Sequence, residues 1–250
     1  MGTSRAVALV TGASRGIGRV TALRLADQGF DVAINYRQSA AEAERTVEEV
    51  EQRAVRAVAL QADVADVEEA RVLVDRATEA LGALTVLVNN AGVTRDRLLI
   101  QMTEDDWAAT WQTNLAGARA VSRAAMCSMK ERGGRIINLS SVVGASGNAG
   151  QANYAAAKSA VLGMTKAFAV QGAASGITVN CVIPGYIVTD ATSHLSEEQQ
   201  NVWLRRIPMG RSARPEEVAE IIAFLAGPGA GYITGQCIAV DGGLLAVSGT

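Results

Sequence analysis

Short runs of β-branched residues alternate with longer amphipathic stretches along the whole chain. This alternation is typical of repeated β–α–β units, which build a mainly parallel sheet with helices on both faces. The pattern predicts a single α/β domain over residues 1–250, with a doubly wound, seven-stranded parallel sheet. The strands are expected at Ala6–Thr11, Asp31–Tyr36, Arg56–Gln61, Leu84–Asn89, Arg135–Leu139, Thr178–Ile183 and Gln236–Val240.

Several helix starts can be predicted from capping residues. Ser39 with Glu42, and Ser196 with Gln199, have the spacing of a capping box, and Pro215 is of the type favoured at a first helical position. The segment Tyr186–Arg211 differs, because it follows a strand without a clear sheet-packing period. An insertion beyond the carboxyl end of a strand is placed to cover a ligand, so we expect a substrate lid there.

Composition and charge narrow the function classes. Hydrophobic residues make up 49% of the chain and charged residues 19%, with a net charge of −2, which argues against general binding of nucleic acid or anionic membranes. No stretch approaches the ~18 apolar residues of a membrane span, and residues 1–5 do not resemble a signal peptide. Three scattered cysteines and a single histidine, His194, indicate neither a disulfide framework nor a metal site. A cytoplasmic protein without a metal is expected.

A glycine-rich turn follows the first predicted strand and opens a helix. It reads Thr11-Gly12-Ala13-Ser14-Arg15-Gly16-Ile17-Gly18. Glycines allow the backbone to approach a pyrophosphate closely, and the N–H groups of a helix start favour its charge. The G-x-x-x-G-x-G spacing differs from G-x-G-x-x-G, so an ordinary strand-to-helix turn is the alternative.

The end of the second predicted strand bears on which dinucleotide is bound. No acidic residue stands where one would hold the ribose hydroxyls of NAD, and the chain instead carries Arg37. Arg37, together with Arg15, could receive a 2′-phosphate, because guanidinium groups pair well with phosphate oxygens. This favours NADP(H), although both arginines could equally be solvated surface charges.

Tyr154 and Lys158 lie four residues apart in a predicted Ala-rich helix. This spacing places them on one helical face, where an ammonium can stabilise a phenolate. A tyrosine pKa near ~10 would then move towards the range useful for proton transfer at neutral pH. The alternative is a half-buried tyrosine beside a solvated lysine.

With these features the chain resembles the short-chain dehydrogenase/reductase family of Rossmann-type oxidoreductases, within it the 3-oxoacyl-[acyl-carrier-protein] reductase branch. The resemblance covers essentially the entire chain. It rests on Thr11–Gly18, Asp63-Val64, Asn89-Asn90-Ala91-Gly92, Asn114, Ser140-Ser141, Tyr154 with Lys158, Pro184-Gly185 and Asp241-Gly242-Gly243.

The resemblance implies roles for individual residues. Tyr154 would be the general acid, Ser141 would polarise the substrate carbonyl, Lys158 would lower the tyrosine pKa and bind the nicotinamide ribose, and Asn114 would hold a relay water. Ser140 should face the other way on an extended strand and is expected to be structural, whereas for Asn89 a purely structural role is the alternative. Cofactor contacts are implied for Gly12, Ser14, Arg15, Gly16, Ile17, Gly18, Arg37, Asp63, Val64, Asn90, Ala91, Gly92, Tyr154, Lys158, Pro184, Gly185, Ile187 and Thr189.

The implied substrate is a 3-oxoacyl thioester, in fatty-acid or polyketide biosynthesis, and the implied assembly is a homotetramer. Lys130, Arg132 and Arg135 could dock an acidic acyl carrier protein or merely suit a helix C-terminus. Gly172, inside a helix, and Ser175, where the branch has a basic residue, depart from the pattern and leave a 3-oxoacyl-CoA reductase open. A catalytically idle dinucleotide sensor and a scaffold are rival classes, which the four intact residues Asn114, Ser141, Tyr154 and Lys158 disfavour.

Overall fold

The computed structural model describes residues 5–189 and 196–247. Within them, seven parallel strands form one sheet in the order β3-β2-β1-β4-β5-β6-β7, which confirms the predicted doubly wound α/β fold. The strands are β1 Val7–Val10, β2 Asp31–Tyr36, β3 Ala57–Gln61, β4 Leu84–Asn89, β5 Gly134–Leu139, β6 Ile177–Pro184 and β7 Cys237–Val240.

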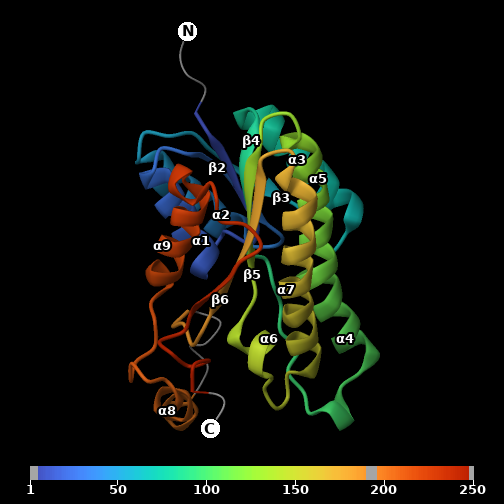
Figure 1. Cartoon of the computed structure of the whole chain (residues 1–250), viewed down its shortest axis with the longest axis vertical. Coiled ribbons are helices and arrows are strands. Elements are labelled where there is room, and N and C mark those ends of the chain that lie inside the picture. Colours follow the sequence, from blue (N-terminus) through green and yellow to red (C-terminus); the bar gives the residue numbers. More distant parts are fainter. Residues whose placement is uncertain (1–4, 190–195, 248–250) are drawn as a thin grey trace.

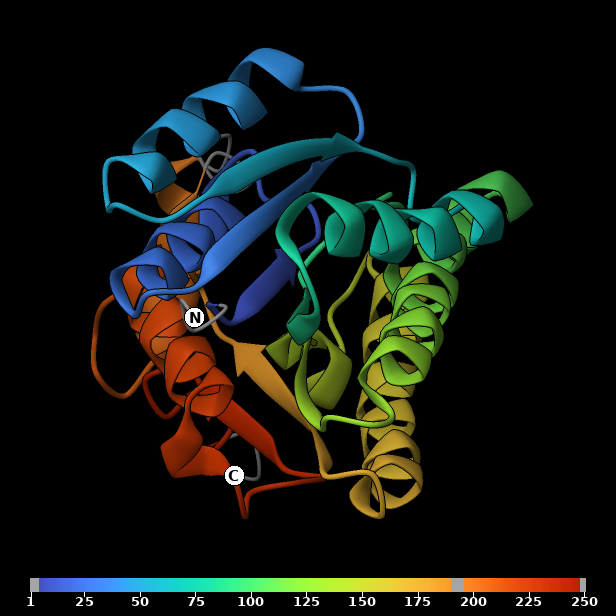
Figure 2. The ribbon, with the colours of Figure 1, turned by 90° about the horizontal axis from the view of Figure 1, so that it is seen from above.

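Helices cover both faces of this sheet, so that it forms the middle of three layers (Figures 1 and 2). One apolar core packs α1, α2 and α9 on one face, and a second packs α3, α5 and α7 on the other. The helices are α1 Gly16–Asp27, α2 Ala40–Glu51, α3 Val67–Leu81, α4 Glu104–Trp111, α5 Ala118–Met129, α6 Val142–Ser146, α7 Ala152–Ala173, α8 Glu197–Arg206 and α9 Pro215–Ala226.

Alternate strand residues enter the two cores. In β1, Ala8 and Val10 belong to the core under α1 and α9, whereas Val7 and Leu9 belong to the core under α3 and α5. Because successive side chains point to opposite faces, a strand buried on both sides must be apolar at nearly every position. This explains the apolar runs that mark strands such as β1 in the sequence.

Helices begin at all three predicted positions, although only one of the two predicted capping boxes forms. Ser196 and Gln199 form a reciprocal capping box at α8, and Pro215 is the first residue of α9. Ser39 directly precedes α2, as predicted, but its side chain makes no capping hydrogen bond, so the capping box expected with Glu42 is wrong. Its backbone (φ −89°, ψ 67°) lies outside the extended conformation usual for a capping residue.

The structure accounts for the glycine inside α7. A Cβ atom built at Gly172 would lie 3.0 Å from the carbonyl oxygen of Ile177 and 3.1 Å from its Cβ. Gly172 therefore lets the end of α7 pack tightly against the start of β6. The helical cost of a glycine, about 1 kcal/mol relative to alanine, is offset by this close approach.

The change of winding direction lies between β1 and β4, since β1 has β2 on one side and β4 on the other. In open α/β sheets, ligands bind beyond the carboxyl ends of the strands at this point. The glycine turn after β1 and the Asn90 loop after β4 both lie there. Among the described residues, no helix is long and apolar enough to cross a membrane.

Candidate active site

The glycine turn after β1 is clamped to the loop after β4. The Thr11 hydroxyl accepts hydrogen bonds from the backbone N–H groups of Asn90 and Ala91, both at 3.0 Å. The Asn90 side-chain amide donates to the carbonyls of Thr11 and Gly12 at 2.8 and 2.9 Å. A Cβ atom at Gly12 would lie only 2.9 Å from Ala91 Cα. The glycine is thus required for the two loops to meet.

The start of α1 forms a cradle suited to a pyrophosphate. Arg15 precedes the helix in an extended conformation, no side chain caps the first turn, and that turn carries no acidic residue. Gly16 has φ +57°, and a Cβ atom there would lie 3.9 Å from Thr189 Cγ2, so Thr189 faces the turn from beyond β6. Backbone N–H groups at a helix start favour an anion, so the predicted dinucleotide site fits the residues present. Ser14 is buried in this turn, and Ile17 packs into the core under α1.

Arg37 and Asp63 lie together at the ends of β2 and β3. Their side chains form an ion pair with Arg37 Nη1 3.7 Å from Asp63 Oδ2. Arg37 is therefore paired with Asp63 while its side chain stays exposed to solvent. Both side chains are more than a third exposed, so this pair holds the guanidinium only weakly. Arg15 is exposed in the glycine turn.

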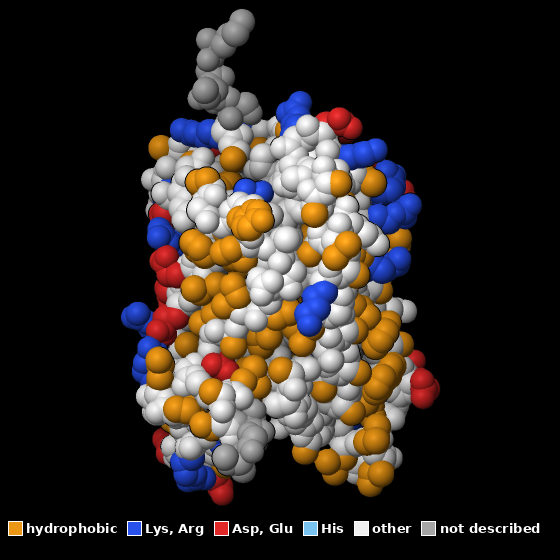
Figure 3. Space-filling view, in the orientation of Figure 1, with side chains coloured by type: hydrophobic (Ala, Val, Ile, Leu, Met, Phe, Trp, Pro, Cys, Tyr) orange, Lys and Arg blue, Asp and Glu red, His pale blue; other side chains and the backbone are white. Residues whose placement is uncertain are grey.

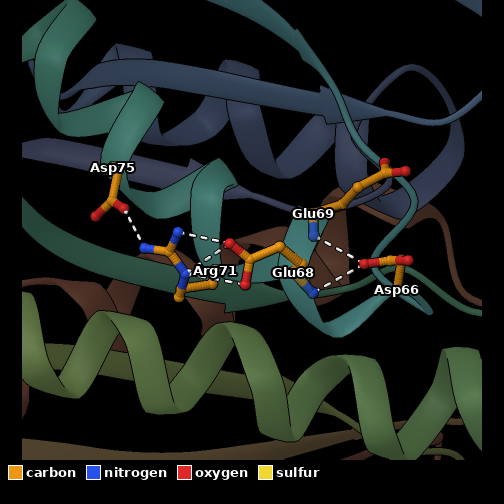
Figure 4. Close-up of polar contacts among 5 residues, drawn as sticks. All are labelled: Asp66, Glu68, Glu69, Arg71 and Asp75. Carbon is orange, nitrogen blue, oxygen red and sulfur yellow. Dashed lines mark hydrogen bonds and ion pairs between the residues drawn. The ribbon is translucent and has the colours of Figure 1, made fainter.

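The loop that carries Asp63 and Val64 is fixed by the start of α3. Asp66 caps this helix, because its carboxylate accepts from the backbone N–H groups of Glu68 and Glu69 at 2.8 and 3.0 Å (Figure 4). The Glu69 carboxylate accepts in turn from the Asp63 N–H at 2.7 Å. Val64 is buried behind the exposed carboxylates. This places a rigid loop beside the glycine turn.

The structure brings Ser141 and Tyr154 together. Ser141 follows β5, and its hydroxyl caps α6 by accepting from the Val143 N–H at 3.2 Å. Tyr154 lies in the first turn of α7, and Ser141 hydrogen-bonds to its phenolic oxygen. Burial raises the pKa of Tyr154 to about 12, and the Ser141 hydrogen bond offsets part of this rise. The phenol therefore carries its proton at neutral pH, as a general acid must.

Lys158 is buried one turn further along α7. Its ammonium donates to the Leu139 carbonyl at 2.8 Å and lies 5.8 Å from the centre of the Tyr154 ring. Burial lowers the pKa of Lys158 to about 8. The expected lowering of the tyrosine pKa by the lysine is not found in this structure, because burial of the phenol dominates. A Cβ atom at Gly92 would lie 3.6 Å from Lys158 Nζ, so the ammonium faces the loop after β4.

Asn114 is placed by a π-helical turn, Gln112–Gly117, between α4 and α5. Such wide turns are rare in proteins, and those that occur are often found at functional sites. The side chain donates to the Val93 carbonyl and accepts from the Val93 N–H, both at 2.8 Å. Asn114 therefore holds the loop after β4 in place, a role that the sequence did not reveal. The predicted relay water stays a prediction.

Ser140 has the structural role predicted for it, and Asn89 has the structural contacts considered as its alternative. The Ser140 hydroxyl donates to the Lys158 carbonyl at 2.7 Å, which ties β5 to α7 beside the site. Asn89 donates to Ser122 and Asn138 at 2.8 Å each, within a buried polar network. Both side chains point into the protein.

The segment after β6 is anchored to the end of β7. The Gly185 N–H donates to the Val240 carbonyl at 3.0 Å, and a Cβ atom at Gly185 would lie 2.7 Å from Asp241 Cα. Pro184 and Ile187 are buried on this path. Further on, Trp203 of α8 stacks on Tyr186, with ring centres 6.3 Å apart. His194 lies outside the described residues.

Asn153 is a buried site residue that the sequence analysis missed. Its amide donates to the carbonyls of Arg95 and Asp106 and to the Thr110 hydroxyl at 3.0 to 3.1 Å. It thereby connects the start of α7 to α4 and to the loop before it. A polar residue next to the candidate tyrosine was the only available signal, because the partners are 43 to 58 residues away in sequence.

Lys130, Arg132 and Arg135 lie at the opposite end of the sheet from Tyr154. They surround the start of β5, whereas Ser141 follows its end, and the 6 residues of this strand span about 20 Å. Figure 3 shows Lys and Arg side chains gathered at that end of the molecule. Strand direction therefore separates these three cations from the chain's own site, and the docking of an acyl carrier protein by them stays a prediction.

Comparison with known proteins agrees with this geometry. A family model described as Enoyl-(Acyl carrier protein) reductase matches residues 12–245. The 3-oxoacyl-[acyl-carrier-protein] reductase FabG of Staphylococcus aureus (strain Mu50) is 50% identical over 238 residues, covering 95% of this chain and 97% of the relative. The 3-oxoacyl-[acyl-carrier-protein] reductase of Synechocystis sp. is 48% identical, covering 96% of each chain. A solved structure described as a short-chain alcohol dehydrogenase, from Sinorhizobium meliloti 1021, has a TM-score of 0.93 and 40% identity, covering 98% of each chain.

Proposed function

Because the chain belongs to the short-chain dehydrogenase/reductase family, and is thus an oxidoreductase with a nicotinamide cofactor, we propose that it reduces a 3-oxoacyl thioester to the 3-hydroxyacyl thioester with NADPH. The contact between Ser141 and Tyr154 beside the glycine turn carries this proposal. It aims two hydroxyl groups at one point beyond the sheet, where a carbonyl oxygen can be held.

The protein residues have distinct tasks in this reaction. Bound NADPH supplies the hydride. Ser141 donates a hydrogen bond to the carbonyl oxygen, and Tyr154 transfers its phenolic proton to that oxygen as negative charge develops there. Lys158 orients the cofactor through its ammonium, and Asn114 holds the water through which the tyrosine regains a proton.

The cofactor would lie across the switch point of the sheet. Arg37 and Arg15 receive the 2′-phosphate, and Lys158 and Tyr154 contact the nicotinamide ribose. The pyrophosphate would be held by Gly12, Ser14, Gly16, Ile17 and Gly18, and the adenine by Asp63 and Val64. The backbone past the ribose would be that of Asn90, Ala91 and Gly92. The nicotinamide amide would be held by Pro184, Gly185, Ile187 and Thr189.

Two further features belong to this proposal. The segment 186–211, with Trp203 of α8 stacked on Tyr186, covers the substrate as a lid.

The protein assembles as a homotetramer through apolar helix faces. Val170 on α7 is 80% exposed and Ile100, before α4, is 91% exposed, and Figure 3 shows apolar side chains along this flank. Exposed apolar patches of this kind indicate protein contacts.

The substrate and cofactor can be tested together. NADPH and NADH oxidation would be followed with one 3-oxoacyl group presented on acyl carrier protein and, separately, on CoA. We expect NADPH with the carrier-borne substrate to be preferred. Equal or faster turnover of the CoA ester would instead indicate a CoA-thioester reductase, and no oxidation of either cofactor would contradict the proposal.

Cofactor choice has its own variant. Arg37→Ala should raise KM for NADPH by about tenfold and leave KM for NADH unchanged, because only NADPH carries the 2′-phosphate. Arg45→Ala, an exposed cation on α2, is the matched control. An equal change for both cofactors would show that Arg37 does not meet the phosphate.

A further inference from the structure

Two cysteines lie side by side on the last two strands of the sheet. Cys181 of β6 and Cys237 of β7 are partners in the parallel register. Their side chains project from the same face, and the two thiols share a hydrogen bond. Paired strands run about 4.8 Å apart, which lies within the Cα separations that a disulfide can span.

The two thiols differ in access and in acidity. Cys181 is fully buried, whereas Cys237 is half-buried on β7, which is the edge strand of the sheet among the described residues. The hydrogen bond from Cys181 and the nearby charge of Lys166 lower the pKa of Cys237 to about 7, and the same hydrogen bond, together with burial, raises the pKa of Cys181. Only thiolates react readily with peroxides, so Cys237 is the reactive partner.

The two cysteines lie next to the candidate active site, on its buried side. Both cysteines belong to the apolar cluster that also packs Tyr154. The Cys181 sulfur lies beside the backbone N–H of Ser140 and near enough to Lys158 to sense its charge. A covalent bond at this point would draw β7 against β6 beneath the catalytic lysine.

We propose that Cys237 and Cys181 are a peroxide-oxidised thiol pair, which closes an intrachain disulfide and thereby slows catalysis. The Cys237 thiolate attacks a hydroperoxide, breaks its O–O bond and becomes a sulfenic acid, while the leaving alkoxide or hydroxide takes up a proton. The Cys181 thiol then attacks the sulfenyl sulfur; the S–S bond forms and its proton leaves with the hydroxyl as water. A dithiol reductant reverses the oxidation.

The test uses the full-length protein with Cys127→Ser, which removes the exposed third thiol on α5. After treatment with hydrogen peroxide, we expect the intact chain to lose two hydrogens and a peptide pair joining Cys181 to Cys237 to appear. Turnover should fall and return to its starting value with dithiothreitol. The fall in turnover rests on the proposed function, whereas the thiol chemistry is measured without it.

Two variants separate the steps. With Cys237→Ser, activity should be retained and should resist peroxide. With Cys181→Ser, or Cys181→Ala if the serine variant folds poorly, sulfenic acid should accumulate on Cys237 and be trapped by dimedone. If the protein turns over no thioester, the affinity for NADPH is measured before and after oxidation instead. A change in this affinity would then show that the disulfide affects the active site.

Three results would overturn the proposal. Cys237 could stay reduced under conditions that oxidise Cys127 in the unmodified protein. Oxidation could link two chains through Cys237 rather than closing a bond within one. A disulfide that leaves both turnover and NADPH affinity unchanged would refute the coupling to the active site.

Discussion

The ends of β4 and β5 each carry two identical polar residues in a row, and the members of each pair serve different regions of the molecule. Asn89 and Ser140 turn into the protein interior, where their side chains bond to Asn138 and to the Lys158 carbonyl. Asn90 and Ser141, one residue later, hold the glycine turn and meet Tyr154. Residue type alone does not distinguish a structural from a functional position; the direction in which the strand points the side chain does.

The largest effect is expected at Tyr154, in the region that the outward-pointing Asn90 and Ser141 serve. Tyr154→Phe removes the proton that the carbonyl oxygen must receive, so kcat should fall by about 10²–10⁴-fold, while NADPH binding persists. Tyr36→Phe at the end of β2 is the control and should leave kcat unchanged. Steady-state kinetics and NADPH titration measure the two effects. A Tyr154→Phe variant that kept both NADPH binding and turnover would show that Tyr154 is not the general acid.

The two serines test the comparison most directly. Ser141→Ala should lower kcat by about 10²-fold, because it removes a donor to the developing oxyanion, and the loss of its cap on α6 should lower the free energy of unfolding by about 1 kcal/mol. Ser140→Ala should affect stability alone. It removes a buried hydrogen bond, so the free energy of unfolding should fall by about 1 kcal/mol while kcat stays near its original value. Denaturant melts and kinetics on both variants are required. Similar losses of kcat would contradict the division into two regions.

The fold was largely predictable because its signal is local and repeated. Apolar runs such as that of β1 locate strands buried on both faces, and no end of an observed strand differs from the predicted one by more than one residue. Ser196 and Ser39 show the limit. Both have the spacing of a capping box, but only Ser196 has the backbone conformation that lets its hydroxyl reach the helix.

The site was predictable where its residues share one element and not where they meet across the fold. Tyr154 and Lys158 are separated by one helical turn, so their pairing follows from the sequence. The bonds of Asn114 to Val93, the contacts of Asn153 and the pairing of Cys181 with Cys237 depend on loops and strand register far apart in the chain. The position of Lys130 at the opposite end of the sheet from Tyr154 likewise follows from strand direction, which composition does not give.

Lys158 belongs to both regions, because its carbonyl bonds to the inward-pointing Ser140 and its ammonium lies near Tyr154. Its contribution to the free energy of unfolding should depend on pH. Its pKa is lowered from 10.5 to about 8 on folding, so the unfolded chain binds more protons between these values. Stability should therefore rise with pH across this window, and the buried ammonium destabilises the protein below it. Lys158→Met should remove this dependence and raise the free energy of unfolding at pH 7 by about 1–3 kcal/mol, although activity is lost.

Urea melts at several pH values below 10 would measure this effect, before Tyr154 begins to titrate in the unfolded state. Lys166→Met, an exposed position on the same helix, should show no comparable gain. If Lys158→Met is less stable than the original protein at pH 7, the bond to Leu139 outweighs the cost of burying the charge.

The smallest effect extends the comparison to two glycines of α7. Gly163 has no atom within 4 Å of an added Cβ, so Gly163→Ala should stabilise the helix by about 0.5–1 kcal/mol. The same change at Gly172 gains the same propensity but presses a methyl group against Ile177, and we expect a net loss of about 1 kcal/mol. Opposite shifts in the urea midpoint would show that position, not residue type, decides the outcome here as well. Equal gains would mean that β6 yields easily, and the tight contact would then not explain why α7 contains Gly172.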